Sequence, residues 1–140
     1  MQPSEIVSKM MSVDWFSQWL GIEVLDVGEG SCKLRMKIRR EMLNGFGIAH
    51  GGISYSLADS ALAFASNSKG RQSLSIDTSI SHIKPLKEGE VISAEANCTT
   101  ETEKLGHYQV TISRGGQIVA LFKGLVFKTP EHWQPDSQKK

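Results

Sequence analysis

The stretch GGISYSLADSALAFASNS, residues 51–68, decides the fold of this chain. Wound into an α-helix, it places apolar side chains around most of the circumference, and its other positions are nearly all Ser, Gly or Asn. A helix of this kind is buried, so other elements must cover it on most sides. We therefore predict a long central helix over residues 51–68, with Gly70 as its C′ glycine.

The residues before this helix predict one shorter helix and two strands. Apolar residues at helical spacing indicate an amphipathic helix over residues 4–20, which Gly21 ends. A strand begins at Ile22, and the Gly28-Glu29-Gly30 turn follows it. Residues 33–39 alternate charged and apolar side chains, which is typical of a half-buried antiparallel strand. Its exposed basic face carries Lys33, Arg35, Lys37 and Arg39.

The residues after the central helix predict about four further strands. Residues 74–81, 92–98 and 108–112 each alternate apolar and polar side chains, with Leu74 and Ile76 on the apolar side of the first run. Gly115-Gly116 predicts a two-residue hairpin turn, which leads into a strand over residues 118–127. A sheet that is curved by its own twist can cover the helix. We therefore expect the α+β class, with an antiparallel β-sheet wrapped around a long central helix.

The length of 140 residues suits a single domain, 1–140, and leaves little room for a second. After Thr129 the sequence is polar, contains Pro130 and Pro135 and ends in two lysines. We expect residues from about 130 to 140 to form a flexible tail. A domain of this size buries a limited core, so pairing with a copy of itself would add stability.

The charge of the chain is nearly balanced, with 16 Lys and Arg against 15 Asp and Glu. A net charge of +1 gives no long-range attraction to nucleic acid or to an acidic membrane, and we expect neither as a partner. The N-terminus lacks the order of a signal peptide, and no run approaches the ~18 apolar residues of a membrane span. We expect a cytoplasmic protein. The scattered histidines and the two distant cysteines have no metal-ligand spacing, so we expect no metal.

Asp59 is the only residue between positions 51 and 68 that is charged at neutral pH. A carboxylate in the middle of a buried helix is costly unless it is paired, solvated by a cleft or used in chemistry. Asp is also a poor residue for a helix interior, which argues against a role in local stability. Taken alone, Asp59 is equally consistent with a structural role and with a role as a catalytic acid.

His50-Gly51-Gly52 stands at the start of the same helix. Two glycines there let a ligand approach the backbone, whose free N–H groups and partial positive charge can hold an oxyanion. A tight turn into the helix is the plainer interpretation of the same residues. Gly51 and Asp59 are eight residues apart, which is ~12 Å along a helix. If both groups act on one substrate, Asp59 must come from a second copy, so this chemistry implies a two-fold dimer.

Three short motifs together resemble the phenylacetate-degradation (PaaI-type) branch of the hotdog thioesterases. They are Leu43-Asn44-Gly45, His50-Gly51-Gly52 and Ser56-Leu57-Ala58-Asp59-Ser60. Residues 120–124, ALFKG, are similar to the last strand of that branch, and the resemblance covers about residues 15–128. It implies a hotdog fold, a homodimer or a homotetramer built as a dimer of dimers, and hydrolysis of acyl-CoA. It implies neither metal nor redox cofactor, because coenzyme A is part of the substrate.

The resemblance also implies roles for the residues of these motifs. Asp59 matches the catalytic acid, and Gly51 matches the backbone donor to the thioester oxygen. Asn44 matches the polar residue that positions substrate or water, and His50 resembles the residue that fixes the loop.

Three further positions are substrate-binding candidates by the same resemblance. Gly52 completes the glycine pair, and Ser60 stands where relatives often have Thr. Residues 82–85, HIKP, are similar to an aromatic-x-Arg-Pro stretch near the cofactor end, so Lys84 is a candidate for contact with the phosphates of coenzyme A.

Several functions and mechanisms stay open at this point. Asp59 can activate water as a general base or attack as a nucleophile. A hotdog hydratase or dehydratase is one alternative, although the D-x-x-P-x-H pattern of one such branch is missing; a non-catalytic acyl-CoA-binding protein is the other. The acyl group is not specified, and both aryl-acetyl and medium-chain groups fit the sequence.

Overall fold

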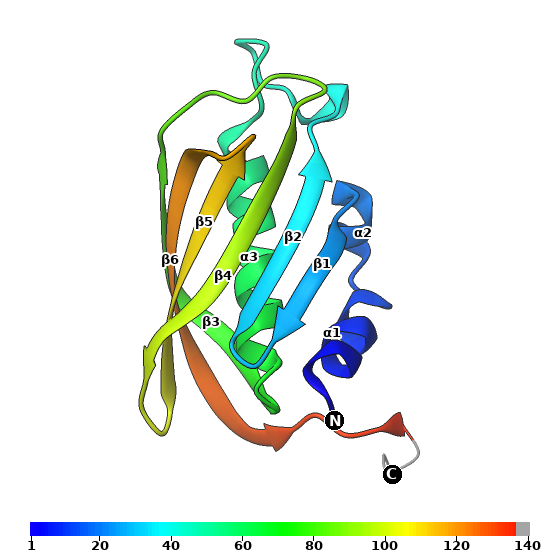
Figure 1. Cartoon of the computed structure of the whole chain (residues 1–140), viewed down its shortest axis with the longest axis vertical. Coiled ribbons are helices and arrows are strands. Elements are labelled where there is room, and N and C mark those ends of the chain that lie inside the picture. Colours follow the sequence, from blue (N-terminus) through cyan, green and yellow to red (C-terminus); the bar gives the residue numbers. More distant parts are fainter. Residues whose placement is uncertain (137–140) are drawn as a thin grey trace.

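The central helix, α3 (Gly51–Asn67), packs against one face of a six-stranded antiparallel sheet in the computed structural model, which describes residues 1–136 (Figure 1). The strands are β1 (Glu23–Gly28), β2 (Ser31–Lys37), β3 (Arg71–His82), β4 (Val91–Glu101), β5 (Leu105–Arg114) and β6 (Gln117–His132). Their order across the sheet is β1-β2-β4-β5-β6-β3. The predicted arrangement, a sheet wrapped around a helix, is confirmed.

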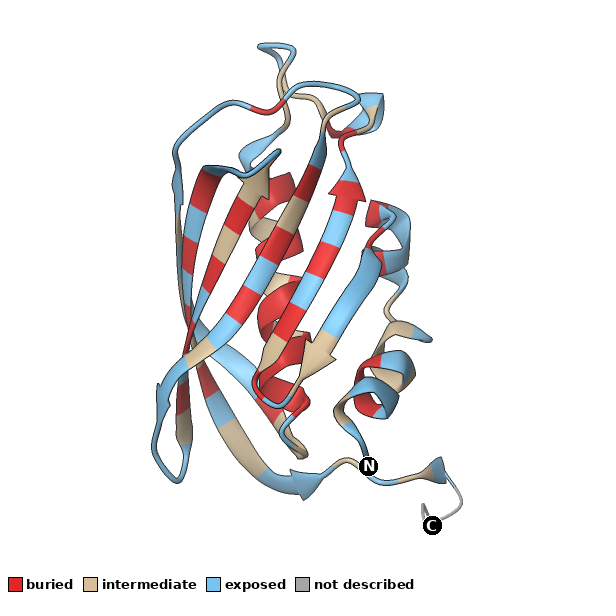
Figure 2. Ribbon diagram, viewed as in Figure 1, coloured by how far each residue is buried: buried red, intermediate tan, exposed pale blue. Residues whose placement is uncertain are grey.

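The helix α3 is buried along most of its length, as Figure 2 shows. Leu57, Ala61 and Leu62 are fully inaccessible, and all strands from β2 to β6 contact the helix. The helix ends one residue earlier than predicted, at Asn67, with Ser68 as its C-cap. The Ser68 hydroxyl donates to the Gly28 carbonyl and accepts from the Gly30 N–H, which ties this end of α3 to the β1–β2 turn.

Gly70 has a φ of +113°, as a glycine that ends a helix often does, but it is not the C′ residue as predicted: with Ser68 as the C-cap, C′ is Lys69 and Gly70 follows it. The N-terminal region forms two helices, α1 (Pro3–Met11) and α2 (Trp15–Leu20), instead of the single helix expected over residues 4–20. The break has a local cause, because the Asp14 carboxylate accepts from the Ser17 N–H at 2.9 Å and so caps a new helix. Gly21 ends α2 in a left-handed conformation, as predicted.

The alternation predicted for residues 33–39 is confirmed over β2. Leu34 and Met36 are buried against α3, while Lys33, Arg35 and Lys37, which alternate with them, are exposed. Arg39 is the exception, because it lies beyond the strand and its guanidinium donates to the carbonyls of Trp19 and Leu20. The chain then forms a short 3-10 helix, η1 (Arg40–Met42), before the loop that enters α3.

The edge strand β3 differs most from its predicted burial. Leu74 and Ile76 are 66% and 58% exposed, although the alternation placed them on the apolar side of a covered strand. One side of β3 pairs with β6, and the other side faces no strand among the described residues. An edge strand with exposed apolar side chains is a surface on which another chain can pair. The strand itself is confirmed, but its burial here is the reverse of the prediction, because Ser73 is buried and bonded to Asn67 of α3 while Leu74 and Ile76 are exposed.

The chain after Thr129 is more regular than the sequence predicts. The Gly115-Gly116 turn joins β5 to β6 as expected, with both glycines at positive φ. Strand β6 then continues to His132, and the Trp133 N–H donates to the Gly70 carbonyl at 2.8 Å. The last part of the expected tail, residues 137–140, lies outside the described residues. No helix of residues 1–136 is long and apolar enough to cross a membrane.

Candidate functional site

Two separate cavities lie along α3, and the predicted site residues divide between them. The first cavity, of about 290 Å³, is at the N-terminus of the helix, and we call it the Gly51 cavity. It is lined by Asn44, Ile48, Ala49, Gly51, Ser54, His82, Ile83, Lys84, Pro85, Leu86, Val119 and Ala120. The structure therefore brings together three residues that the sequence separates by up to 40 positions, Asn44, Gly51 and Lys84.

The start of α3 offers one free backbone donor to this cavity. His50 is the N-cap, and its Nδ1 accepts from the Gly52 N–H at 2.9 Å. The His50 backbone N–H donates to the Met42 carbonyl at 2.8 Å, which ties the loop to the residues before it. The exposed Gly51 N–H has no acceptor among residues 1–136. Of the two glycines, only Gly51 therefore has an N–H free to bind a ligand.

Asn44 shapes the loop that leads into the helix. Its Oδ1 accepts from the Phe46 N–H at 2.9 Å, and its own N–H donates to the Ile48 carbonyl at 2.7 Å. Such a turn fixes the orientation of the side chain. The Nδ2 group has no partner within the described part of the chain, so it can donate to a ligand in the Gly51 cavity.

His82 is a residue of this cavity that the sequence interpretation missed. It ends β3, its Nδ1 is 3.3 Å from the Ser54 hydroxyl, and its Nε2 would lie 3.1 Å from a Cβ on Gly51. The HIKP stretch, residues 82–85, is the sequence signal that could have identified His82. Because the similar stretch has an aromatic residue at this position, the resemblance pointed only to Lys84. The Lys84 N–H donates to the Val119 carbonyl, and its side chain is exposed at the cavity.

The second cavity, of about 360 Å³, contains Asp59, and we call it the Asp59 cavity. It is lined by Met10, Asp59, Leu62, Ala63, Ser66, Asn67, Gln72, Ser73, Leu74, Ser75, Val126 and Trp133. The two cavities share no lining residue, so Gly51 and Asp59 do not meet within one chain. This agrees with their separation of ~12 Å along the helix.

The Asp59 carboxylate is half-buried and has no hydrogen-bond or ion-pair partner among the described residues. Burial raises the pKa of its carboxyl above the ordinary value, and the negative charge of Asp14 raises this pKa further. A carboxylate in this state is more basic than an exposed one and is available to a ligand. Ser75 on β3 lines the same cavity and was also missed, because the strand alternation assigned it to the solvent-facing side.

Ser60 is not brought together with the other candidates. Its hydroxyl lies 2.8 Å from that of Ser17, which in turn donates to the Asp14 carboxylate. Ser60 is 8% exposed and lines neither cavity. Its hydroxyl joins α3 to α2 and thereby supports the helix beside Asp59.

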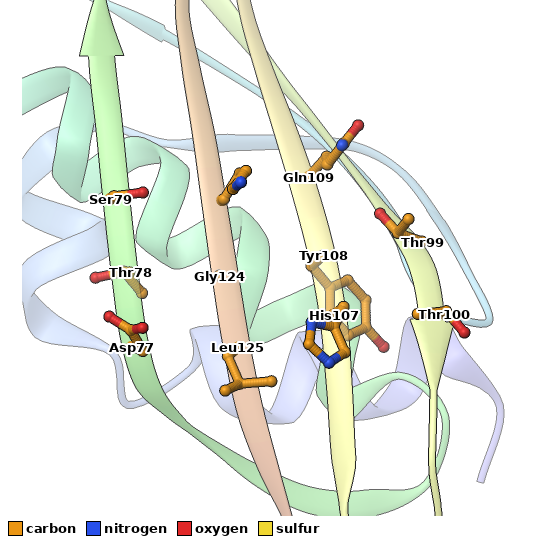
Figure 3. Close-up of a pocket in the computed structure, with 11 residues that line it drawn as sticks. Asp77, Thr78, Ser79, Thr99, Thr100, His107, Tyr108, Gln109, Gly124 and Leu125 are labelled. Carbon is orange, nitrogen blue, oxygen red and sulfur yellow. The ribbon is translucent and has the colours of Figure 1, made fainter.

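A third cavity, of about 340 Å³, lies over the strands β3 to β6 (Figure 3). Its lining includes Asp77, Ser79, His107 and Gln109, which are exposed side chains, and none of the predicted site residues. On β5 the buried Tyr108 alternates with His107 and Gln109, so these two point away from α3. The third cavity therefore includes side chains on the sheet face away from α3, and neither Asp59 nor Gly51 lines it.

Comparisons with known proteins identify the family. The thioesterase superfamily matches residues 46–121. Acyl-coenzyme A thioesterase PaaI of Escherichia coli K12 is 34% identical over 116 residues, covering 82% of this chain and 83% of that protein. Human acyl-coenzyme A thioesterase 13 is 27% identical over 121 residues, covering 83% of this chain and 86% of that protein.

Solved structures agree. The structure of the E. coli PaaI protein from the phenylacetic acid degradation operon has a TM-score of 0.90 with this chain, at 30% identity. The match covers 93% of this chain and 95% of that one. The resemblance inferred from three short motifs is thus confirmed, and the chain belongs to the thioesterase superfamily, as a PaaI-type member with the hotdog fold.

Proposed function

We propose that this protein hydrolyses acyl-CoA thioesters to the free acid and coenzyme A. The observation that carries the proposal is the Asp59 carboxylate, which is half-buried, unpartnered within residues 1–136 and raised in pKa, in a cavity of a thioesterase-superfamily chain. Two relatives that span most of this chain are named acyl-coenzyme A thioesterases, which supports the same substrate class.

The reaction needs a polarised carbonyl and an attacking oxygen. The Gly51 N–H, at the positive end of α3, donates to the thioester oxygen and stabilises the oxyanion. Asp59 either takes a proton from the water that attacks the carbonyl carbon, or attacks that carbon itself and forms an anhydride that water then cleaves. In both cases the C–S bond breaks, and the sulfur of coenzyme A leaves as a thiolate that takes up a proton.

The two cavities form one site if two chains pair along β3. The Asp59 cavity borders the start of β3 at residues 72–75, and the Gly51 cavity borders its end at His82. In a two-fold antiparallel pair of identical strands, the start of one lies beside the end of the other. Asp59 of one subunit then faces Gly51 of its partner. The exposed Leu74 and Ile76 on β3 support this interface.

The remaining assignments belong to the same proposal. Asn44, through its free amide group, positions the substrate or the attacking water. His50 and Gly52 hold the start of α3 in place, and Lys84 meets the phosphates of coenzyme A from the edge of the Gly51 cavity. No metal or redox cofactor takes part, and the active form is a dimer or a tetramer built as a dimer of dimers. We expect it to work in the cytoplasm.

The experiment that tests the proposal is turnover of a panel of aromatic, short-chain and long-chain acyl-CoAs. Release of free coenzyme A can be followed with a thiol reagent. We expect release that depends on enzyme concentration for at least one substrate class. Tight binding of an acyl-CoA without release would instead support a non-catalytic binder. Reversible hydration of an enoyl-CoA without thiol release would support a hydratase.

Gly51→Ala is expected to lower kcat/KM by about 10–10²-fold without unfolding the protein. The new methyl group would lie 3.1 Å from His82 Nε2, in the space where the thioester oxygen approaches the Gly51 N–H. A misplacement of about 1 Å at this point costs that order of rate. Steady-state kinetics and circular dichroism measure the two effects.

A double variant separates the two possible causes of this loss. In Gly51→Ala/His82→Ala the crowding against the imidazole is relieved, but the methyl group still stands at the amide. The activity of the double variant should therefore stay well below that of His82→Ala alone. If the double variant is as active as His82→Ala, the Gly51 N–H does not contact the substrate.

The pH dependence of hydrolysis should report the carboxyl of Asp59. Because burial and Asp14 raise its pKa, kcat/KM should fall as the pH drops through a value above the ordinary range of Asp. Asp14→Asn removes the negative charge but keeps an oxygen that can cap α2. The acid limb of the profile should therefore move to lower pH in this variant. An unchanged limb would contradict the assignment of the limb to Asp59.

A further inference from the structure

Thioester hydrolysis includes a proton transfer to sulfur, and neither Gly51 nor an ionised Asp59 starts with a proton to give. Asp59 acts as a base or as a nucleophile, and the Gly51 N–H keeps its hydrogen while it binds the oxyanion. The thiolate of coenzyme A leaves as a base, since an unperturbed alkyl thiol has a pKa of about 8.5. A side chain that gives a proton to the sulfur would therefore assist the departure of coenzyme A.

His82 is held beside Gly51 by the pairing of β3 with β6. It is the last residue of β3 and pairs with Ala120 of β6. The next N–H along the chain, that of Ile83, donates to the Val119 carbonyl at 2.9 Å. The His82 Nε2 would lie 3.1 Å from a Cβ on Gly51, nearer than the ring carbons Cε1 and Cδ2 at 3.5 and 3.8 Å. The imidazole thus presents a nitrogen, not a carbon, as its closest atom to Gly51.

The Nε2 atom and the Gly51 N–H can reach one thioester together. A backbone N and a Cβ are two bonds apart, a distance of about 2.5 Å, so Nε2 lies within about 5.6 Å of the Gly51 nitrogen. A hydrogen bond from an N–H to oxygen spans about 2.9 Å. The oxygen and the sulfur of a thioester are bonded to the same carbon. With the oxygen on the Gly51 N–H, the sulfur is therefore within reach of His82 Nε2.

The Ser54 hydroxyl fixes which nitrogen of His82 exchanges a proton. It lies 3.3 Å from Nδ1 and donates to the Gly51 carbonyl, also at 3.3 Å. A hydroxyl has one hydrogen, so while it donates to this carbonyl it can only accept from an N–H at Nδ1. The transferable proton is then the one at Nε2, which has no partner among residues 1–136. The nitrogen that gains and loses the proton is therefore the one nearest Gly51.

The other polar side chains that line the Gly51 cavity suit this step less well. Asn44 carries an amide, which has no acidic proton, and the Ser54 hydrogen is engaged with the Gly51 carbonyl. Lys84 is assigned to the phosphates of coenzyme A. A histidine takes up and releases a proton near neutral pH. His82 is also exposed, so it can recover its proton from water between turnovers.

We propose that His82 is a catalytic residue, the general acid that protonates the sulfur of coenzyme A as the C–S bond breaks. The proposal rests on the thioesterase function proposed above and adds the group that completes the release of the thiol. The electron pair of the C–S bond passes to sulfur, the Nε2 proton moves to sulfur, and the imidazolium becomes a neutral imidazole. His82 regains a proton from solvent, and the proton taken from the attacking water returns to solvent. In the shared site, Asp59 and His82 then belong to different subunits.

The test varies the leaving group at a constant acyl group. It compares an acyl-CoA with the 4-nitrothiophenyl thioester of the same acid, whose thiolate is a far weaker base and leaves without a proton. In His82→Gln, kcat/KM should fall by about 10²-fold for the acyl-CoA and by less than about threefold for the aryl thioester. Each variant is compared with the wild type on the same substrate, so differences in substrate affinity cancel. His107→Gln is the matched control, because His107 is exposed and lines neither the Gly51 cavity nor the Asp59 cavity.

Other roles of His82 give other results. Loss of a donor to the oxyanion, or of a structural contact, slows both substrates alike, so equal losses in His82→Gln would overturn the proposal. His82→Phe keeps an aromatic ring but has no proton to transfer, and it should show the same selective loss. Wild-type turnover of acyl-CoA by His82→Phe would also overturn the proposal. A wild-type protein that hydrolyses neither substrate would refute the thioesterase function itself, whereas equal losses in an active enzyme refute only the role of His82.

Discussion

Asp59→Asn is expected to lower kcat by about 10²–10⁴, the usual contribution of a general base or nucleophile. The amide keeps the shape of the side chain but cannot accept the proton of water or attack a carbonyl. KM should change little, since the amide still fills the same place in the Asp59 cavity. Steady-state hydrolysis of the preferred acyl-CoA measures both constants.

The stability of the same variant separates a catalytic role from a structural one. Because burial and the charge of Asp14 raise the pKa of Asp59 above its ordinary value, the folded protein binds this proton more tightly than the unfolded chain does. The folded state therefore loses stability as the pH rises from the unfolded pKa through the folded one, and at neutral pH the charged Asp59 destabilises the fold. Asn carries no charge, so Asp59→Asn should melt at the same or a higher temperature.

A structural role predicts the opposite pattern. If Asp59 held a neighbouring element, the amide would lower the melting temperature in proportion to the loss of activity. The absence of any partner for this carboxylate within residues 1–136 argues against such a role. A stable Asp59→Asn protein that hydrolyses acyl-CoA at nearly the wild-type rate would refute the mechanism.

The sequence predicts the core of this fold because the signals there are local. The buried helix and the strand alternation depend on apolar periods, and β2 and α3 bear these out. The alternation of β3 assigns Leu74 and Ile76 to the covered face, but the structure exposes them, and Ser73 and Ser75 lie beside α3 instead. Pro130 suggested an end to β6, yet the strand continues to His132, and Pro130 lies in the irregular pairing between Lys128 and His132.

The site was predictable only where it follows from a motif. Gly51, Asn44 and Asp59 fall within short, recognisable stretches. His82 and Trp133 lie 31 and 74 positions from Gly51 and Asp59, respectively, and no local pattern links them. Their neighbours are set by the return of β3 and β6 along α3, so their roles became visible only in three dimensions.

A mixed dimer tests whether the two cavities complete one another. Asp59→Asn and Gly51→Val should each be nearly inactive as homodimers, the second because a larger side chain crowds His82 and blocks the amide. In a dimer that contains one chain of each kind, one of the two interfacial sites has both altered groups and the other has both groups intact. Such a dimer, co-expressed with two tags and purified on both, should regain about half of the wild-type activity per dimer.

The opposite pairing gives the matched control. A dimer of a wild-type chain and a chain with both substitutions has one altered group in each shared site, so it should be nearly inactive. If Gly51 and Asp59 acted within one subunit, this second dimer would keep half of the activity and the first would have none. The shared-site model therefore predicts activity only in the first mixed dimer, and the single-subunit model predicts activity only in the second. The antiparallel relation of the cavities along β3 favours regain of activity in the first dimer alone.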